Sequence, residues 1–270
     1  MNILLHSIAL EPARWTPQRV SRPLVELLPE IAKAGFSEIE IYEPHLTAET
    51  AVPSIKAALE ANRLTPVVLS SYVNLNPAAT SDADLEPLFT QIADRIAFYG
   101  FKKLRLFPGP KMDPSDKAGI EVFKNRVKLL ATRIPQTEVL LETHDGSLAD
   151  DSSVIVRIVQ ELNLPNVALL FQPTFFQKRE PILDQFTLQK PYIRHIHLQN
   201  RLPDLSFVKM DAGIIPWPEI IAQLDPNTDA TLEFVPVGIC TPEQFDLAET
   251  LKQVAEEIAY VRSLEPVTAV

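Results

Sequence analysis

The sequence EVLLETHDGSLADDSSVIVRIVQELNLPNVALLFQ, residues 138–172, contains one complete structural unit. Two short and mostly apolar runs, 138–142 and 167–171, flank a segment at 152–162 whose apolar residues recur at helical spacing. A strand, a helix and a second strand in this order predict a βαβ unit with parallel strands. The first run ends on Glu142 and the second is followed by Gln172, so each predicted strand finishes on a polar side chain.

The same alternation runs through the whole chain. The predicted strands are Ile3–His6, Glu38–Ile41, Val67–Ser70, Lys103–Phe107, Glu138–Glu142, Val167–Phe171, Ile193–Leu198 and Thr231–Phe234. The predicted helices are Pro23–Ala34, Asp84–Tyr99, Ser115–Arg133, Ser152–Leu162, Glu180–Phe186, Pro218–Leu224 and Pro242–Leu264. The length of 270 residues is close to the roughly 250 of a (β/α)8 barrel. No G-x-G-x-x-G or P-loop motif follows a strand. We therefore predict an α/β fold, a (β/α)8 TIM barrel, with residues 1–270 as a single domain.

Composition narrows the classes of function. The formal net charge is −10, which argues against nucleic acid as a partner, because binding to phosphates depends on basic groups. Cys240 is the only cysteine, so an intramolecular disulfide is excluded. The first residues lack the basic cluster of a signal peptide, and no apolar run reaches the roughly 18 residues of a membrane helix. These features predict a soluble, cytoplasmic protein with a small-molecule ligand.

Polar residues gather at the ends of the predicted strands, where the chemistry of such barrels takes place. Glu142, Gln172 and Glu233 end or follow three strands, and His195 and His197, two residues apart, share one face of a fourth. The other polar residues near strand ends are His6, Glu40, Arg105 and His144. Carboxylates and an imidazole from different strands are typical ligands of one divalent metal ion, namely Mn²⁺, Mg²⁺, Co²⁺ or Zn²⁺. Two carboxylates on opposed strands can also act as acid and base.

Each of these residues also has a structural interpretation. A glutamate at a strand end is often solvated or paired with a cation, and His195 fits a buried core position. Arg105 could pair with a carboxylate, and Glu40 could be its partner.

Several motifs together resemble the xylose-isomerase-like TIM barrel superfamily, which includes sugar phosphate isomerases and epimerases and the AP endonuclease family 2. They are AGFSEIEIYEPHL (34–46), LRLFPG (104–109), LLETHDG (140–146), HIHLQN (195–200), DAGIIPWPEII (211–221) and LEF (232–234). The resemblance implies one divalent metal held by Glu142, Gln172, His197 and Glu233. It also implies that Glu142 and Glu233 exchange protons next to a substrate carbonyl, and that His6, Glu40, Arg105 and His144 line the substrate side.

Two positions depart from the pattern of this superfamily. Its members usually have Asp and, three residues later, His after strand six, where this chain has Gln172 and Phe175. They often have Lys-Asp after the strand-seven histidine, where this chain has Gln199 and Asn200. A glutamine oxygen can bind a hard cation but brings no charge, so metal affinity is expected to fall and metal occupancy is left open.

The site residues and the resemblance leave four candidate functions. The first is a metal-dependent isomerase or epimerase of a keto-sugar or related polyol. The second is a lyase on the same scaffold, an inosose or dehydroshikimate-type dehydratase. Gln172 and Phe175 motivate the third, a non-catalytic sugar-binding barrel. A nuclease is disfavoured by the charge and by a total of five histidines. The resemblance also allows a homodimer.

Overall fold

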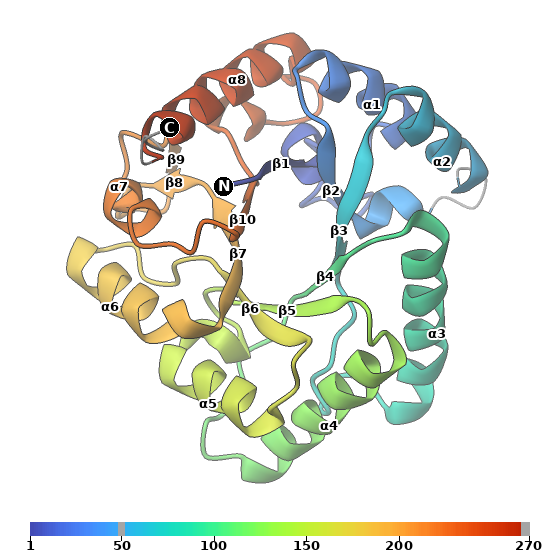
Figure 1. Ribbon diagram of the computed structural model, residues 1–270, viewed down its shortest axis with the longest axis vertical. Coiled ribbons are helices and arrows are strands. Elements are labelled where there is room, and N and C mark those ends of the chain that lie inside the picture. Colours follow the sequence, from blue (N-terminus) through green and yellow to red (C-terminus); the bar gives the residue numbers. More distant parts are fainter. Residues whose placement is uncertain (48–51, 266–270) are drawn as a thin grey trace. The chain divides into compact units, whose positions relative to one another are not determined.

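The computed structural model describes residues 1–47 and 52–265 (Figure 1). Its main sheet is a closed barrel of parallel strands in the order β1-β10-β7-β6-β5-β4-β3-β2. The strands are β1 Ile3–His6, β2 Glu38–Tyr42, β3 Thr65–Ser71, β4 Lys103–Leu106, β5 Glu138–Glu142, β6 Val167–Phe171, β7 Ile193–Leu198 and β10 Asp229–Leu232. The helices are α1 Leu24–Lys33, α2 Val52–Ala61, α3 Asp82–Tyr99, α4 Lys117–Arg133, α5 Ser152–Leu162, α6 Arg179–Gln189, α7 Trp217–Ile221 and α8 Leu247–Ser263. This alternation confirms the predicted (β/α)8 TIM barrel.

The chain forms two compact units. Unit 1 comprises Met1–Pro66, Phe175–Leu183 and Ile196–Val270, and unit 2 comprises Val67–Thr174 and Asp184–His195. Strand β7 therefore contributes its first three residues to unit 2 and its last three to unit 1. That residues 1–270 form a single domain stays a prediction.

In unit 1, strand β1 pairs with both β10 and β2. The register sets Leu4 beside Thr231 and His6 beside Glu40, so two of the predicted site residues are direct neighbours in the sheet. Helices α1 and α2 lie next to each other outside β1 and β2 (Figure 1). A short antiparallel ribbon, β8 (Asn200–Arg201) with β9 (Phe207–Val208), follows β7.

In unit 2, strands β3 to β6 pair in sequence order, and helices α3, α4 and α5 lie outside them (Figure 1). Leu140, Ala168 and Leu170 pack together as part of the buried core.

Local sequence signals define the ends of helix α3. Ser81 caps α3 through its side chain, and Gly100, at φ +78°, ends the same helix in the left-handed conformation that glycine adopts without strain.

Besides shifts of up to three residues at other ends, the structure differs from the predicted elements in three places. Helix α2 was not predicted, because Ile55 and Leu59 are the only large apolar residues of its described part and give a weak periodicity. Helix α8 begins at Leu247 rather than after Thr241, since residues 241–244 form a separate turn and Asp246 caps the helix. Strand β10 ends at Leu232, so Glu233 lies just beyond it.

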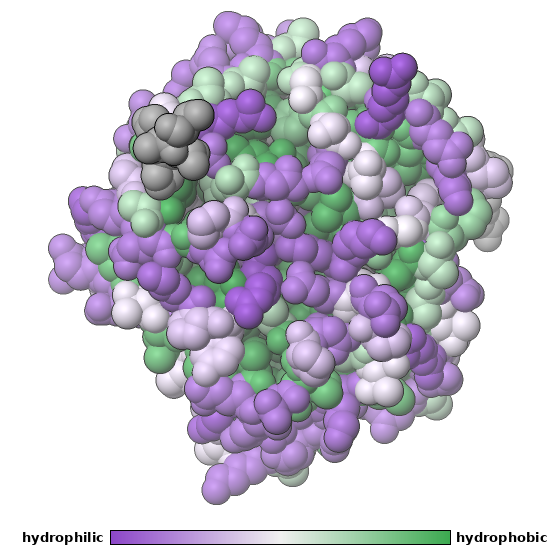
Figure 2. Space-filling view, viewed as in Figure 1, coloured by the Kyte–Doolittle hydropathy of each residue, from purple (hydrophilic) through white to green (hydrophobic). Residues whose placement is uncertain are grey.

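Most of the side chains on the face shown in Figure 2 are hydrophilic, with apolar residues scattered between them. Within the described ranges, no helix combines the length and the apolar character needed to cross a membrane.

Candidate active site

The carboxyl ends of the strands carry buried polar side chains. His6 is the last residue of β1 and Glu142 the last of β5, while Gln172 follows β6 and Glu233 follows β10. His6 and Glu142 are fully buried, and Gln172 and Glu233 are nearly so. Burying such groups costs free energy unless partners satisfy them, so their contacts indicate what each can do.

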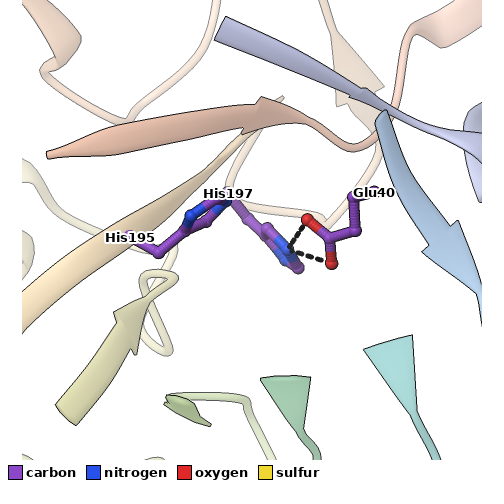
Figure 3. Close-up of side chains that lie close together, drawn as sticks. All are labelled: Glu40, His195 and His197. Carbon is purple, nitrogen blue, oxygen red and sulfur yellow. Dashed lines mark hydrogen bonds and ion pairs between the residues drawn. The ribbon is translucent and has the colours of Figure 1, made fainter. Parts of the chain in front are cut away.

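Glu40 and His197 form a buried pair in unit 1. Nε2 of His197 lies 3.1 Å from Oε1 and 3.2 Å from Oε2 of Glu40, and neither side chain is exposed. Figure 3 shows this contact, with His195 two residues earlier on β7. An ionised carboxylate only accepts hydrogen bonds, and the Glu40 oxygens lie closer to the ring than Oε1 of Glu233, which is 3.5 Å from Nδ1. The hydrogen of a neutral His197 ring is therefore assigned to Nε2.

His6 is the second imidazole beside Glu40. Its Nδ1 accepts a hydrogen bond from the backbone N–H of Ile8 at 3.2 Å, so the ring hydrogen of neutral His6 is on Nε2. That Nε2 lies 3.4 Å from Oε1 of Glu40. The His6 and His197 rings are 5.8 Å apart, and the Nε2 atom of each lies within 3.4 Å of a Glu40 oxygen.

Glu233 contacts the other side of the His197 ring. Its Oε1 lies 3.5 Å from Nδ1 of His197, and its Oε2 accepts a hydrogen bond from Nε2 of Gln199 at 3.0 Å. Gln199 in turn accepts at Oε1 from Nε of Arg201, also at 3.0 Å. A continuous polar chain thus runs from Arg201 through Gln199, Glu233 and His197 to Glu40.

An aromatic group lies next to Glu233. The Phe234 ring contacts Phe207 edge-on at 5.2 Å and Trp15 at 5.8 Å, and Trp15 is 63% exposed. The Arg14 guanidinium lies 4.4 Å from the centre of the Trp15 ring. Burial lowers the pKa of Arg14 to about 10, although nearby Cys240, Glu11 and Glu233 oppose this effect.

A buried glutamate holds the loop that carries Arg14 and Trp15. Glu11 accepts hydrogen bonds from the backbone of Ala13, Ser21 and Arg22 and from the Ser21 hydroxyl, and Nε2 of His45 lies 3.4 Å away. Burial alone would raise the pKa of Glu11, but the bonds from His45, Ser21 and the backbone together lower it from 4.5 to about 2.

In unit 2, Arg105 and Glu142 form a buried ion pair between Nη2 and Oε2. The guanidinium also lies 4.8 Å from the centre of the Tyr72 ring. His144, which is partly exposed, contacts the Phe107 ring edge-on at 5.0 Å. The interpretation of Arg105 as a partner of a carboxylate is confirmed by this contact with Glu142.

The backbone of Gln172 is fixed by Thr143. Its N–H donates to the Thr143 hydroxyl at 2.9 Å, and that hydroxyl donates to the Gln172 carbonyl at 2.6 Å. These two bonds tie the residue after β6 to the residue after β5.

The loop between β3 and α3 is held by its own side chains. Its Asn74 and Asn76 side chains accept hydrogen bonds from backbone N–H groups two residues later, at 2.9 Å each. Both asparagines therefore serve local turns.

Trp217 is fully buried and donates to the carbonyl of Gln199 at 2.8 Å, so it packs in the core of unit 1.

Within unit 1 the predicted residues His6, Glu40, His197 and Glu233 are in contact with one another, and within unit 2 Arg105 contacts Glu142. The sequence did not point to Gln199 as a partner of Glu233. Its position two residues after His197, on the same face of the chain, was the available signal.

The distance between the donor atoms of His197 and Glu233 suits two ligands of one metal ion. Nδ1 of His197 and Oε1 of Glu233 are 3.5 Å apart, and two ligands with bonds of about 2.1 Å to one ion lie roughly 3.0–3.4 Å from each other. His197 belongs to two groups of residues whose donor atoms are close enough for one ion, one containing Glu40 and the other Glu233. Unit 1 therefore offers one imidazole and a carboxylate on either side of it.

Comparison with known proteins places this architecture in a family. A profile described as "Xylose isomerase-like TIM barrel" matches residues 28–264. The 3-dehydroshikimate dehydratase of Bacillus anthracis is 26% identical over 178 residues. The match covers 62% of this chain and 62% of that enzyme, so it spans less than two thirds of the relative's length.

Two solved structures share the fold. The IOLI protein, solved with a bound zinc atom, is 14% identical with a TM-score of 0.73, and the match covers 99% of this chain and all of that one. The 3-keto-D-glucoside 4-epimerase YcjR from E. coli is also 14% identical, with a TM-score of 0.67, and the match covers 97% of this chain and 99% of the epimerase chain. Identities this low establish a shared fold and no more.

Proposed function

The chain belongs to the xylose isomerase-like TIM barrel family, and from that premise we propose that it is a divalent-metal-dependent isomerase or epimerase. Its substrate is a keto-sugar or a related polyol, and the reaction moves a proton next to a carbonyl group. The contact of His197 with Glu233 at the carboxyl ends of the strands is the observation that carries the proposal, because it pairs a metal-ligand nitrogen with a proton-accepting carboxylate.

The proposed metal ligands are Glu142, Gln172, His197 and Glu233. The related structure with zinc supports a metal in this fold, and the ligand types suit Mn²⁺, Mg²⁺, Co²⁺ or Zn²⁺. When bound, the ion would polarise the substrate carbonyl and make the neighbouring proton more acidic. Gln172 contributes an oxygen without charge, so this chain is expected to hold its metal less tightly than a chain with Asp at that position.

Glu233 and Glu142 are the proposed proton carriers. Gln199 holds Oε2 of Glu233, which keeps the carboxylate in one orientation and leaves Oε1 on the side of His197. Arg105 holds Oε2 of Glu142 in the same way. Each carboxylate thus has one oxygen held by a neighbouring side chain. Arg105 and His144 are the proposed contacts to substrate hydroxyl groups.

The experiment has two readouts. The purified protein is analysed for bound metal and is then incubated in D₂O with a panel of ketoses while deuterium incorporation is followed by NMR. Metal in the protein and deuterium at the carbon next to the carbonyl would support the proposal, and Glu233→Gln should remove the exchange but not the fold. A metal-free protein that exchanges no member of the panel would refute the proposal and favour the non-catalytic sugar-binding barrel suggested by Gln172 and Phe175.

A dehydratase is the second candidate, and the 26% identity to the 3-dehydroshikimate dehydratase favours it. Both reactions begin with removal of a proton next to a carbonyl, and they differ in whether water then leaves. Elimination from a dehydroshikimate-type or inosose ring creates a conjugated product, so a rise in ultraviolet absorbance would identify this reaction. Deuterium exchange without new absorbance would identify the isomerase or epimerase.

A further inference from the structure

We propose that Glu40 is a positioning residue, which fixes the ring hydrogen of His197 on Nε2 and thereby leaves Nδ1 available to a metal ion. The sequence had suggested that Glu40 contacts substrate. The new role rests on the proposed function in one respect, namely that His197 is a metal ligand.

The geometry of the pair carries this inference. Both oxygens of Glu40 lie within 3.2 Å of Nε2 of His197, and the carboxylate can only accept. The carboxylate of Glu233 is also an acceptor but lies farther from the ring, so the shorter contacts assign the hydrogen of the neutral ring to Nε2 and the lone pair to Nδ1. Nδ1 is the atom that faces Glu233, at 3.5 Å from Oε1. The ring thus has a donating side toward Glu40 and a ligating side toward Glu233.

His6 keeps Glu40 in place. The N–H of Ile8 donates to Nδ1 of His6, which leaves the His6 ring hydrogen on Nε2, the atom that lies 3.4 Å from Oε1 of Glu40. His6 and Glu40 are also paired residues of β1 and β2, so the sheet itself sets their distance. Two imidazoles therefore contact Glu40 in a fully buried position, which suits a fixed support better than a contact that must form and break with substrate.

A buried carboxylate behind a ligating histidine has known consequences. It fixes the tautomer and the ring orientation and makes the ligating nitrogen more basic, and its loss typically weakens metal binding by roughly 10–100-fold. Glutamine at position 40 has nearly the same shape, but its amide can present either an acceptor or a donor to Nε2. Glu40→Gln should therefore allow both tautomers of His197.

The first arm of the test measures Zn²⁺ affinity by competition with a chromophoric chelator. The proteins are the wild type, Glu40→Gln, His197→Gln and Glu43→Gln, the last being a matched charge loss three residues away. We expect Glu40→Gln to bind Zn²⁺ about 10–100-fold more weakly than the wild type, His197→Gln to be weaker still, and Glu43→Gln to be unchanged. Wild-type affinity in Glu40→Gln would overturn the proposal. A loss as large as that of His197→Gln would mean that Glu40 binds the metal directly, together with Nε2 of His197, and would also overturn the proposal.

The second arm does not depend on metal. NMR of the metal-free protein with ¹⁵N-labelled histidine, at mildly alkaline pH, reports which nitrogen of His197 carries the hydrogen. Nε2 is expected in the wild type and a mixture in Glu40→Gln, with circular dichroism confirming that the variant is folded. Hydrogen on Nδ1 in the wild type would overturn the proposal. If the wild type binds no metal at all, the proposed function fails while this arm still decides the role of Glu40.

Discussion

Glu11→Gln removes a buried charge that organises the loop before α1. Glu11 is fully buried and accepts four hydrogen bonds from Ala13, Ser21 and Arg22, with His45 as a further neighbour. Glutamine keeps the length of the side chain but loses the charge, and its NH₂ group would have to point at N–H donors. We expect the variant to fold with a lower free energy of unfolding.

The magnitude follows from the pKa of the carboxyl group. A fall from 4.5 to about 2 means that the folded state favours the charged form by roughly 3 kcal/mol, at about 1.4 kcal/mol for each tenfold change in the protonation equilibrium. Because the pKa is lowered on folding, this stabilisation is fully present above about pH 4.5. It is lost as the pH falls toward 2.

The assay is urea unfolding of the wild type and Glu11→Gln at pH 7 and at pH 3. We expect the variant to be about 2–3 kcal/mol less stable at pH 7 and the difference to shrink markedly at pH 3. Ser21→Ala is the control, since it removes one hydrogen bond but keeps the carboxylate and should cost about 1 kcal/mol. A difference between wild type and Glu11→Gln that is the same at both pH values would refute this account of Glu11.

Three further predictions concern the site and its support. Gln172→Asp should bind Mn²⁺ or Zn²⁺ at least about tenfold more tightly than the wild type, because aspartate adds a charged oxygen ligand. If competition with a chelator gives the same affinity for both proteins, residue 172 is not a ligand. Glu233→Gln should slow deuterium exchange into substrate by roughly 10²–10⁴-fold, and exchange at the wild-type rate would remove Glu233 from the mechanism. Trp217→Phe should lower the free energy of unfolding by about 1–3 kcal/mol, measured in urea, because it leaves the buried Gln199 carbonyl without its indole donor. No loss of stability would show that this bond contributes nothing.

The strands of the barrel could be predicted from the sequence, whereas the site could be predicted only in part. The predicted strands Ile3–His6, Glu138–Glu142, Val167–Phe171 and Ile193–Leu198 have the observed bounds, because each is a short apolar run between clear helical segments. The same pattern located Glu142, His197 and Glu233 by their places at strand ends. The local hydrophobic pattern reports which residues are buried, and it did so correctly for these three.

Partners that are distant in the sequence could not be predicted in the same way. Glu11 directly follows the short 3₁₀ helix Ser7–Leu10 and His45 lies in the 3₁₀ helix Glu43–Leu46, and taken alone each resembles an ordinary surface residue. The contact between them depends on how two loops of the barrel meet. Gln199 was noted only for its departure from a family motif, yet it holds Glu233 and is itself held by Arg201. Such contacts are set by packing, which a one-dimensional pattern does not record.

His197 and Glu233 are proposed to share one divalent metal ion. The most direct measurement is the anomalous difference density of crystals grown with Mn²⁺ or Zn²⁺. We expect a peak about 2.0–2.2 Å from both Nδ1 of His197 and one carboxylate oxygen of Glu233, with Glu40 still bound to Nε2 of His197. A peak held instead by Nε2 of His197 and Glu40, or no peak beside His197 at saturating metal, would rule out this shared site.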